Sequence, residues 1–216
     1  MIRLVCLLIG YVFGLFQTAV IYCKIKGVDI RNVGSGNAGT TNTLRVLGAK
    51  AGFTVLFGDM LKCFLAVMLV TVLFGKSHSD MIVLLKIYAA AGSILGHDFP
   101  FFLKFKGGKG IACTAGYICG FKWTFVIGGL LSFLIPFNIT HYVSLGSLCL
   151  YSVFFLQLIV EGQLGFFGMS QAHLLEMYAI ALAMTCLAFY QHRANIERLI
   201  KGNERKTYIF KKNKVD

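Results

Sequence analysis

Three polar segments interrupt an otherwise apolar chain, and each combines glycine with small polar and basic residues. They read VGSGNAGTTNTLR from Val33 to Arg45, GHDFPFFLKFKGGKG from Gly96 to Gly110, and HRANIERLIKGNERK from His192 to Lys206. Glycine lets a backbone approach a ligand closely, and free N–H groups beside Lys or Arg bind anions. These segments therefore indicate loops that surround a phosphate.

The first segment has the composition of a phosphate-binding turn before a helix. If the chain is helical from Thr41 onward, its preceding loop presents free N–H groups to an anion, and Arg45 follows one turn later. The alternative is a flexible linker followed by an N-capped helix. The residues that we expect to hold phosphate here are Ser35, Gly36, Asn37 and Arg45.

The second segment ends in FKGGKG, which differs from the Walker loop because Gly110 follows the second lysine. Lys106 and Lys109 are separated by Gly107 and Gly108, so both ammonium groups could contact one anion. We expect these four residues to bind substrate phosphate. The alternative is a lysine-rich loop that only contacts lipid headgroups.

His97 precedes a turn at Pro100, and it is either structural or functional. In the third segment His192, Asn195 and Arg198 fall on one helical face by their three-residue spacing, before Gly202 ends the helix. The alternative for this segment is a basic helix that rests on anionic lipid. The residues expected to orient substrates or brace the loops are His97, Asn195 and Glu204, with His192 behind them.

The composition is that of a membrane protein. Of the 216 residues, 57% are hydrophobic and 14% are charged, which leaves too little polar surface for a soluble domain. We expect one membrane domain over residues 1–216, with a basic cytoplasmic tail at 192–216. The net charge of +12 then faces anionic headgroups or substrate, and not nucleic acid. The seven cysteines show no metal-ligand spacing, so no metal and no cofactor are expected.

Seven apolar runs indicate an all-α polytopic membrane protein. A crossing needs about 20 residues, and only the run from Ile111 to Phe121 is too short alone. Five crossings are the fallback if two runs lie shallow. The runs are Leu4–Tyr22, Ala51–Phe74, Met81–Leu95, Ile111–Phe121, Trp123–Ile139, Ser144–Val160 and Ala172–Gln191.

The distribution of basic residues predicts the orientation of the chain. Five of the 21 Lys and Arg lie between Lys24 and Lys50, three between Lys104 and Lys109, and eight between Arg193 and Lys214. The positive-inside rule then places all three polar segments in the cytoplasm and the N-terminus outside. Seven crossings satisfy this arrangement, provided that the run from Ile111 crosses.

Asp59 and Lys62 stand three residues apart inside the second apolar run, so they can pair on one helical face. Charges within a membrane are usually functional or mutually neutralising. Both a structural ion pair and a support for the phosphate site are open.

The three segments resemble the signature motifs of the bacterial acyl-phosphate:glycerol-3-phosphate acyltransferases, the PlsY family. GSGNAGTTNTLR, GHDFP with FKGGKG, and HRANIERL followed by Gly202 and Glu204 occur in the family's order and spacing, over essentially the whole chain. The stretch YVSLGSL also resembles the family, which makes Ser144 a weaker candidate for the phosphate site. Members often carry Arg before that Tyr, where this chain has His141.

The resemblance implies a seven-span enzyme in the bacterial cytoplasmic (inner) membrane, with its active site on the cytoplasmic side. Such an enzyme transfers a fatty acyl group from acyl phosphate to the 1-hydroxyl of glycerol 3-phosphate, giving lysophosphatidic acid and phosphate, without metal. This is the first acylation of bacterial phospholipid synthesis. Its partners are these two substrates, membrane lipids and, as a candidate, the soluble enzyme that makes acyl phosphate.

Two other functions fit the polar segments less well. A membrane transporter of a small phosphorylated anion would use the same basic loops without covalent chemistry. A phosphatidyl-group transferase is disfavoured because the chain has no paired Asp metal motif. Acyl phosphate is already activated, so positioning and electrostatic stabilisation suffice for the acyltransferase and no protein nucleophile is needed.

Overall fold

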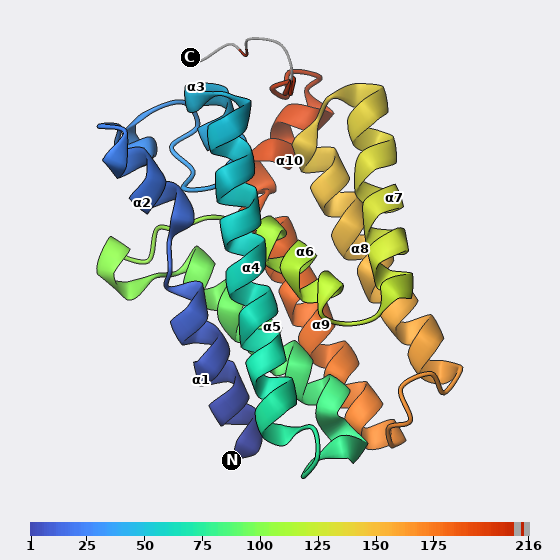
Figure 1. Ribbon diagram of the computed structural model, residues 1–216. Coiled ribbons are helices and arrows are strands. Elements are labelled where there is room, and N and C mark those ends of the chain that lie inside the picture. The colour runs from blue at the N-terminus through green and yellow to red at the C-terminus, as the bar shows by residue number, and fades with distance from the viewer. Residues whose placement is uncertain (210–212, 214–216) are drawn as a thin grey trace.

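The chain forms a bundle of helices, seen in a computed structural model that describes residues 1–209 and 213 (Figure 1). No strand occurs among these residues, and the all-α membrane fold is confirmed. In chain order the elements are α1 (Ile2–Gly14), α2 (Thr18–Ile25), η1 (Ile30–Asn32), α3 (Thr40–Leu47), α4 (Ala49–Phe74), η2 (Ser79–Met81), α5 (Ile82–Asp98), η3 (Phe101–Leu103), α6 (Ile111–Cys119), α7 (Trp123–Thr140), α8 (Val143–Gln163), α9 (Gln171–Gln191) and α10 (Arg193–Ile200).

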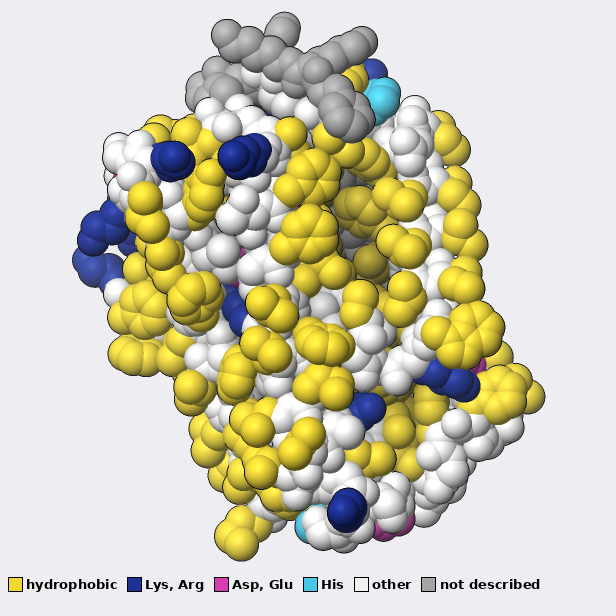
Figure 2. Space-filling model, in the orientation of Figure 1, with side chains coloured by type: hydrophobic (Ala, Val, Ile, Leu, Met, Phe, Trp, Pro, Cys, Tyr) yellow, Lys and Arg dark blue, Asp and Glu magenta, His cyan; other side chains and the backbone are white. Residues whose placement is uncertain are grey.

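Six helical stretches in the described chain are long and apolar enough to cross a membrane. Their exposed faces carry Leu, Ile, Val and Phe, as a lipid-facing surface requires, and Figure 2 shows this hydrophobic cover over much of the bundle. The stretches are Ile2–Ile25, Ala49–Phe74, Ser79–Leu103, Trp123–Thr140, Val143–Gln163 and Gln171–Gln191.

Helices α1 and α5 pack in backbone contact because small residues line their interface. A Cβ added to Gly10 would stand 1.9 Å from the carbonyl oxygen of Ala89, and one added to Gly14 would stand 2.3 Å from that of Ser93. Close approach through small residues is the usual way in which helices associate in lipid. Since the contacts advance together along both helices, α1 and α5 run parallel.

Contacts between other helices fix their directions as well. The Tyr88 hydroxyl of α5 donates to Glu176 of α9 at 2.6 Å, and Gln191 reaches Asp98 at 3.5 Å, so α9 is parallel to α5. Helix α6 is parallel to α4, because Gly116 lies against Met60 and Gly120 against Phe64.

Helix α4 opposes α1, since Lys62 contacts Phe16 while Asp59, one turn earlier in α4, contacts Thr18, which lies further along the chain. Therefore α6, which is parallel to α4, reverses the direction of α5. Figure 1 shows that α7 runs back towards the end of the bundle that holds α3 and α10, and that α8 runs away from it, so the directions alternate along the chain.

Helix α6 has only nine residues, in agreement with an apolar run that is too short to cross alone. It extends about 14 Å at 1.5 Å per residue, roughly half of a ~30 Å hydrocarbon core. Gly120 ends it, and the chain turns back into α7 at Trp123. The run from Ile111 is therefore a short seventh segment and not a full-length helix.

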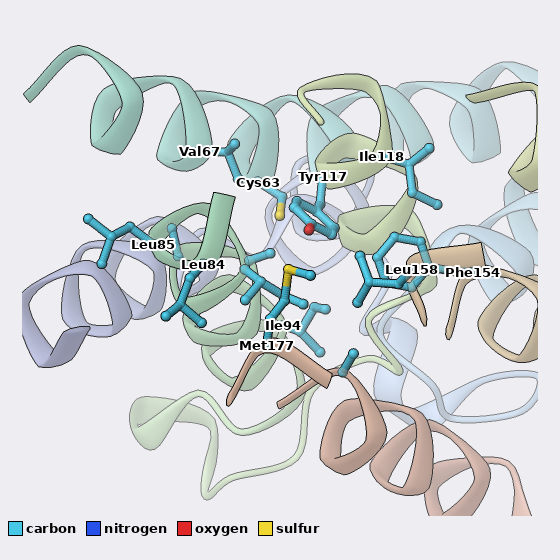
Figure 3. Packing of buried hydrophobic residues seen from close by; sticks show 14 of the residues in the cluster. Cys63, Val67, Leu84, Leu85, Ile94, Tyr117, Ile118, Phe154, Leu158 and Met177 are labelled. Atoms are coloured by element: carbon cyan, nitrogen blue, oxygen red, sulfur yellow. The ribbon is translucent and has the colours of Figure 1, made fainter. Parts of the chain in front are cut away.

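The largest buried cluster lies where α4, α5, α6, α8 and α9 meet (Figure 3). Tyr117 of α6 is surrounded there by Cys63 and Phe154, and its ring contacts that of Phe154 at 5.6 Å. Dispersion and shape complementarity hold these helices together, because lipid supplies no hydrophobic driving force between them. This packing leaves α3, α10 and their loops together at the end of the bundle opposite the N-terminus (Figure 1).

The alternating directions predict which residues share a side of the membrane. Cysteines introduced at Ser35 and Lys206 should react with an impermeant maleimide from the cytoplasm, and cysteines at Lys76 and Gly165 should react only from outside. Native exposed Cys119 and Cys186 are first replaced by serine. Labelling of Ser35→Cys and Lys206→Cys from opposite sides would contradict the arrangement.

Candidate functional site

The three polar segments meet in one cavity of about 540 Å³. It is lined by residues of the loop before α3, the loop before α6, and α10 with the chain that follows it. Asp59 and His97 form part of its inner wall, while Leu56 and Phe133 add apolar lining. The sequence predicted that these segments would converge, although they lie up to 170 residues apart in the chain.

Asn42 shapes the first loop. Its side-chain amide donates to the carbonyl oxygens of Ile30 (3.1 Å) and Val33 (3.0 Å), and its oxygen accepts from the Ser35 N–H at 2.9 Å. The Gly36 N–H donates to Val33. The N–H groups of Ser35 and Gly36 are thus already bonded within the loop, contrary to the expectation that they bind phosphate. The Ser35 hydroxyl and Asn37 do line the cavity.

The N-terminus of α3 supplies free N–H groups in their place. The helix begins at Thr40 without a side-chain cap, and the Thr43 N–H is the first to bond back, to Gly39. Thr40, Thr41 and Asn42 all line the cavity. An uncapped helix start that faces a cavity attracts an anion through its unsatisfied N–H groups and its dipole.

Arg45 lies one turn further along α3, and it also lines the cavity. Its guanidinium donates to the Arg205 carbonyl (3.1 Å) and to the Thr207 hydroxyl (2.7 Å). Thr207 in turn donates its N–H to the His141 carbonyl at 2.9 Å. Arg45 therefore joins the first loop to the chain after α10, and His141 supports that chain through its backbone.

The second loop packs tightly on His97. A Cβ on Gly107 would stand 2.0 Å from the His97 carbonyl oxygen, and one on Gly108 would stand 2.0 Å from its Nε2. The two glycine N–H groups donate to Asp98 and His97 carbonyls, at 3.0 and 3.1 Å. These glycines therefore permit close packing. From the sequence we expected Gly107 and Gly108 to bind phosphate, but their N–H groups already donate to backbone carbonyls.

The two lysines of FKGGKG separate. Lys109 lines the cavity and donates to Oδ1 of Asn195. Lys106 is exposed and lies outside the cavity lining, so of the two lysines only Lys109 lines this cavity, and joint binding of one anion stays a prediction. Burial, with the nearby charge of Arg198, lowers the pKa of Lys109 to about 8.

Glu204 ties the third segment together. Its buried carboxylate accepts hydrogen bonds from Asn195 Nδ2 (2.7 Å), Arg198 Nε (2.7 Å) and Ser144 Oγ (3.1 Å). Since Asn195 also accepts from Lys109, the carboxylate positions that lysine as well. Ser144 thus braces Glu204, although it lines the cavity as expected.

His97 stands over a buried pair of charges in α4. Lys62 forms an ion pair with Asp59 at 2.9 Å and donates to His97 Nδ1 at 2.9 Å. Its ammonium also donates to the Phe16 carbonyl at 2.6 Å. The pair inside the second apolar run therefore supports the site, because it holds the imidazole at the cavity wall.

His192 caps the end of α9 beside the cavity. Its Nδ1 lies 2.7 Å from the Ala188 carbonyl, which can only accept, so Nδ1 carries the proton and Nε2 is free to accept. Burial and the charge of Lys109 lower the pKa of His192 to about 4. This histidine is therefore neutral near pH 7.

Sequence reasoning did not select Asn42 or Arg198 as site residues. Asn42 lies in the first motif, and its seven-residue distance from Ser35 gives no local signal of the hydrogen bond. The three-residue spacing places Arg198 on one helical face with Asn195, but the spacing alone does not indicate that it contacts Glu204. No group of three His, Cys, Asp or Glu side chains that could hold a metal occurs within the described part of the chain.

Known proteins resemble this chain over nearly its full length. The family model described as glycerol-3-phosphate acyltransferase matches residues 4–202. A glycerol-3-phosphate acyltransferase of Endomicrobium trichonymphae is 39% identical, over 98% of this chain and 99% of the relative. One from Thermosipho melanesiensis is 38% identical, over 95% of each chain.

Two solved structures share the fold. The crystal structure of PlsY (YgiH), an integral membrane glycerol 3-phosphate acyltransferase, in its glycerol 3-phosphate form, superposes with a TM-score of 0.81 at 33% identity, covering 95% of this chain and 96% of the other. The lysophosphatidic acid form gives a TM-score of 0.78 at 32% identity, covering 94% of each. With these motifs in one cavity of a membrane bundle, the chain belongs to the glycerol-3-phosphate acyltransferase family.

Proposed function

We propose that this protein transfers the acyl group of acyl phosphate to the 1-hydroxyl of glycerol 3-phosphate. The observation that carries the proposal is a single cavity in which the uncapped start of α3 and two cations from different loops, Arg45 and Lys109, line the wall. Both substrates carry phosphate, so one strongly anion-binding cavity suits the pair. Leu56 and Phe133 add an apolar wall that suits a fatty acyl chain.

Each part of the cavity has a separate role in this proposal. The α3 N-terminus, Ser35, Asn37 and Arg45 hold one phosphate, and Lys109 holds the other with help from Asn195. The glycerol hydroxyl oxygen bonds to the acyl carbonyl carbon while the bond from that carbon to the phosphate oxygen breaks. Phosphate leaves and accepts the hydroxyl proton. Negative charge that develops on the carbonyl oxygen is stabilised by the surrounding cations and N–H donors.

His97 acts as a brace or a hydrogen-bond donor in this scheme, and not as a base. The Lys62 ammonium donates to its Nδ1, so the neutral ring carries its hydrogen on Nε2. Such a ring has no lone pair left to take a proton from the substrate. A proton acceptor on the substrate phosphate fits this arrangement, because no free base is then required.

We also propose how the protein is oriented, which membrane holds it, and what the remaining site residues do. The basic end of the bundle faces the cytoplasm, and the membrane is the bacterial cytoplasmic membrane, which places the cavity where a soluble enzyme could deliver acyl phosphate. Ser144, Glu204 and His192 hold the cavity wall in this assignment. The rival is a transporter of a phosphorylated anion, which the same cavity could serve if it opened at both ends.

The donor assignment predicts a specific reaction. Purified protein in nanodiscs should convert glycerol 3-phosphate and palmitoyl phosphate to 1-acyl-glycerol 3-phosphate and inorganic phosphate, both of which are measured, and chelators should not stop it. Palmitoyl-CoA serves as the control donor. Turnover of the CoA thioester with no reaction of the acyl phosphate would refute the donor, and uptake of glycerol 3-phosphate into proteoliposomes without product would favour the transporter.

Two substitutions test the anion-binding wall. Losing a charge-assisted contact costs about 1.5–3 kcal/mol, so Arg45→Ala or Lys109→Ala should lower kcat/KM by roughly ten- to a hundredfold or more at 1.4 kcal/mol per tenfold. Lys50→Ala, an exposed lysine at the start of α4, is the matched control and should change little. Changing Lys211 or Lys212 of the tail should also change activity little; both lysines lie outside the residues that the structure describes. A fully active Arg45→Ala enzyme would remove Arg45 from the site.

The pKa of Lys109 predicts an alkaline limit on activity. The ammonium is present below pH 8 and is lost above it, so the charged fraction falls about tenfold per pH unit above that value. We expect KM for glycerol 3-phosphate or acyl phosphate to rise above pH 8. Lys109→Arg, which stays charged, should move that limb upward by at least one unit, and an unmoved limb would assign it to another group.

A further inference from the structure

The segment from Pro100 to Lys106 projects sideways from the bundle between the end of α5 and the second loop of the cavity (Figure 1). Three aromatic side chains on it are largely exposed: Phe101 by 59%, Phe102 by 52% and Phe105 by 60%. Phe101 and Phe102 meet edge to face at 5.5 Å. The apolar stretch Ser79–Leu103, a candidate membrane span, ends within this segment, so the three rings lie at or just beyond the end of that span.

The same segment carries two exposed lysines, Lys104 and Lys106. No hydrogen bond or ion pair of either ammonium group is found among the described residues, and no Asp or Glu occurs between Phe99 and Gly110. Figure 2 shows basic side chains beside hydrophobic ones on the flank from which the segment projects. An aromatic cluster next to unpaired cations matches the boundary between lipid acyl chains and phosphate headgroups.

The backbone of the segment contains two left-handed residues. Lys104 and Phe105 have positive φ angles of 54° and 58°, which non-glycine residues adopt only when their surroundings enforce it. The Pro100 carbonyl accepts from the N–H groups of both Leu103 (3.0 Å) and Phe105 (3.1 Å) and so closes the turn. The two left-handed residues are therefore part of one closed turn, which carries the aromatic side chains next to Lys104.

We infer that this segment is a binding site for anionic phospholipid in the cytoplasmic leaflet beside the cavity. Phe101, Phe102 and Phe105 insert among the acyl chains, and Lys104 and Lys106 contact the phosphates of anionic headgroups. The segment continues directly into Gly107, which packs on His97, and into Lys109 at the cavity wall. Bound lipid therefore steadies the loop that carries Lys109. This inference stands apart from the choice of acyl donor.

Lipid quenching of an introduced tryptophan tests the inference. The chain has one tryptophan, Trp123, so Phe102→Trp is made in a Trp123→Phe background and reconstituted in phosphatidylcholine nanodiscs that contain a minor fraction of phosphatidylglycerol. Bromines are placed on the acyl chains of either lipid in turn. A lysine at an anionic surface contributes roughly a fivefold preference, so brominated phosphatidylglycerol should quench at least fivefold more strongly per molecule.

The lysines are tested in the same nanodiscs. Lys104→Gln with Lys106→Gln should reduce quenching by the two lipids to equal values per molecule, whereas the charge-matched control Lys50→Gln with Lys206→Gln should leave the preference intact. Phe105→Trp provides a second reporter if the first variant does not fold. Equal quenching by both lipids in the parent protein, or no quenching by either, would overturn the inference.

Discussion

The buried carboxylate of Glu204 is the interaction on which the cavity depends. It accepts hydrogen bonds from α8 and α10 and, through Asn195, from the loop that carries Lys109. A buried carboxylate is stable only when several donors satisfy it. Because Lys109, Ser144 and Asn195 meet only in the folded bundle, the same network that stabilises the charge also brings three distant parts of the chain together.

A second buried charge, the Lys62 ammonium, connects separate helices at the inner wall of the cavity. It joins α4 to the end of α1 through Phe16, and to α5 through His97. An ammonium within the apolar part of the bundle needs such partners, since an unpaired charge there is expensive. The cavity thus lies between two buried ionic networks whose carboxylates, Asp59 and Glu204, are themselves part of its lining.

Much of this arrangement could be predicted from the sequence. Apolar runs marked the long helices, and the three polar segments marked the cavity. The roles of individual glycines could not be predicted, because Gly107 and Gly108 face His97 only after α5 and α6 pack together. For the same reason the local sequence did not indicate that Lys106 and Lys109, three residues apart, would differ. Lys109 lines the cavity, whereas Lys106 is exposed outside it. The nine residues of α6 fall within the apolar run from Ile111 to Phe121, so its shortness could be predicted from the sequence.

The shortness of α6 has a mechanical consequence for the surrounding bilayer. The turn after Gly120 presents Lys122, which pairs with Glu161 at 3.0 Å and lies 4.4 Å above the Phe166 ring. The exposed apolar helix that follows this turn, α7, has 18 residues, compared with the 26 residues of α4. Hydrophobic mismatch costs fractions of a kcal/mol per Å, so lipids must thin there or headgroups must dip towards the ion pair. The mismatch, and with it the free-energy cost at the α6–α7 turn, would therefore increase in a thicker bilayer.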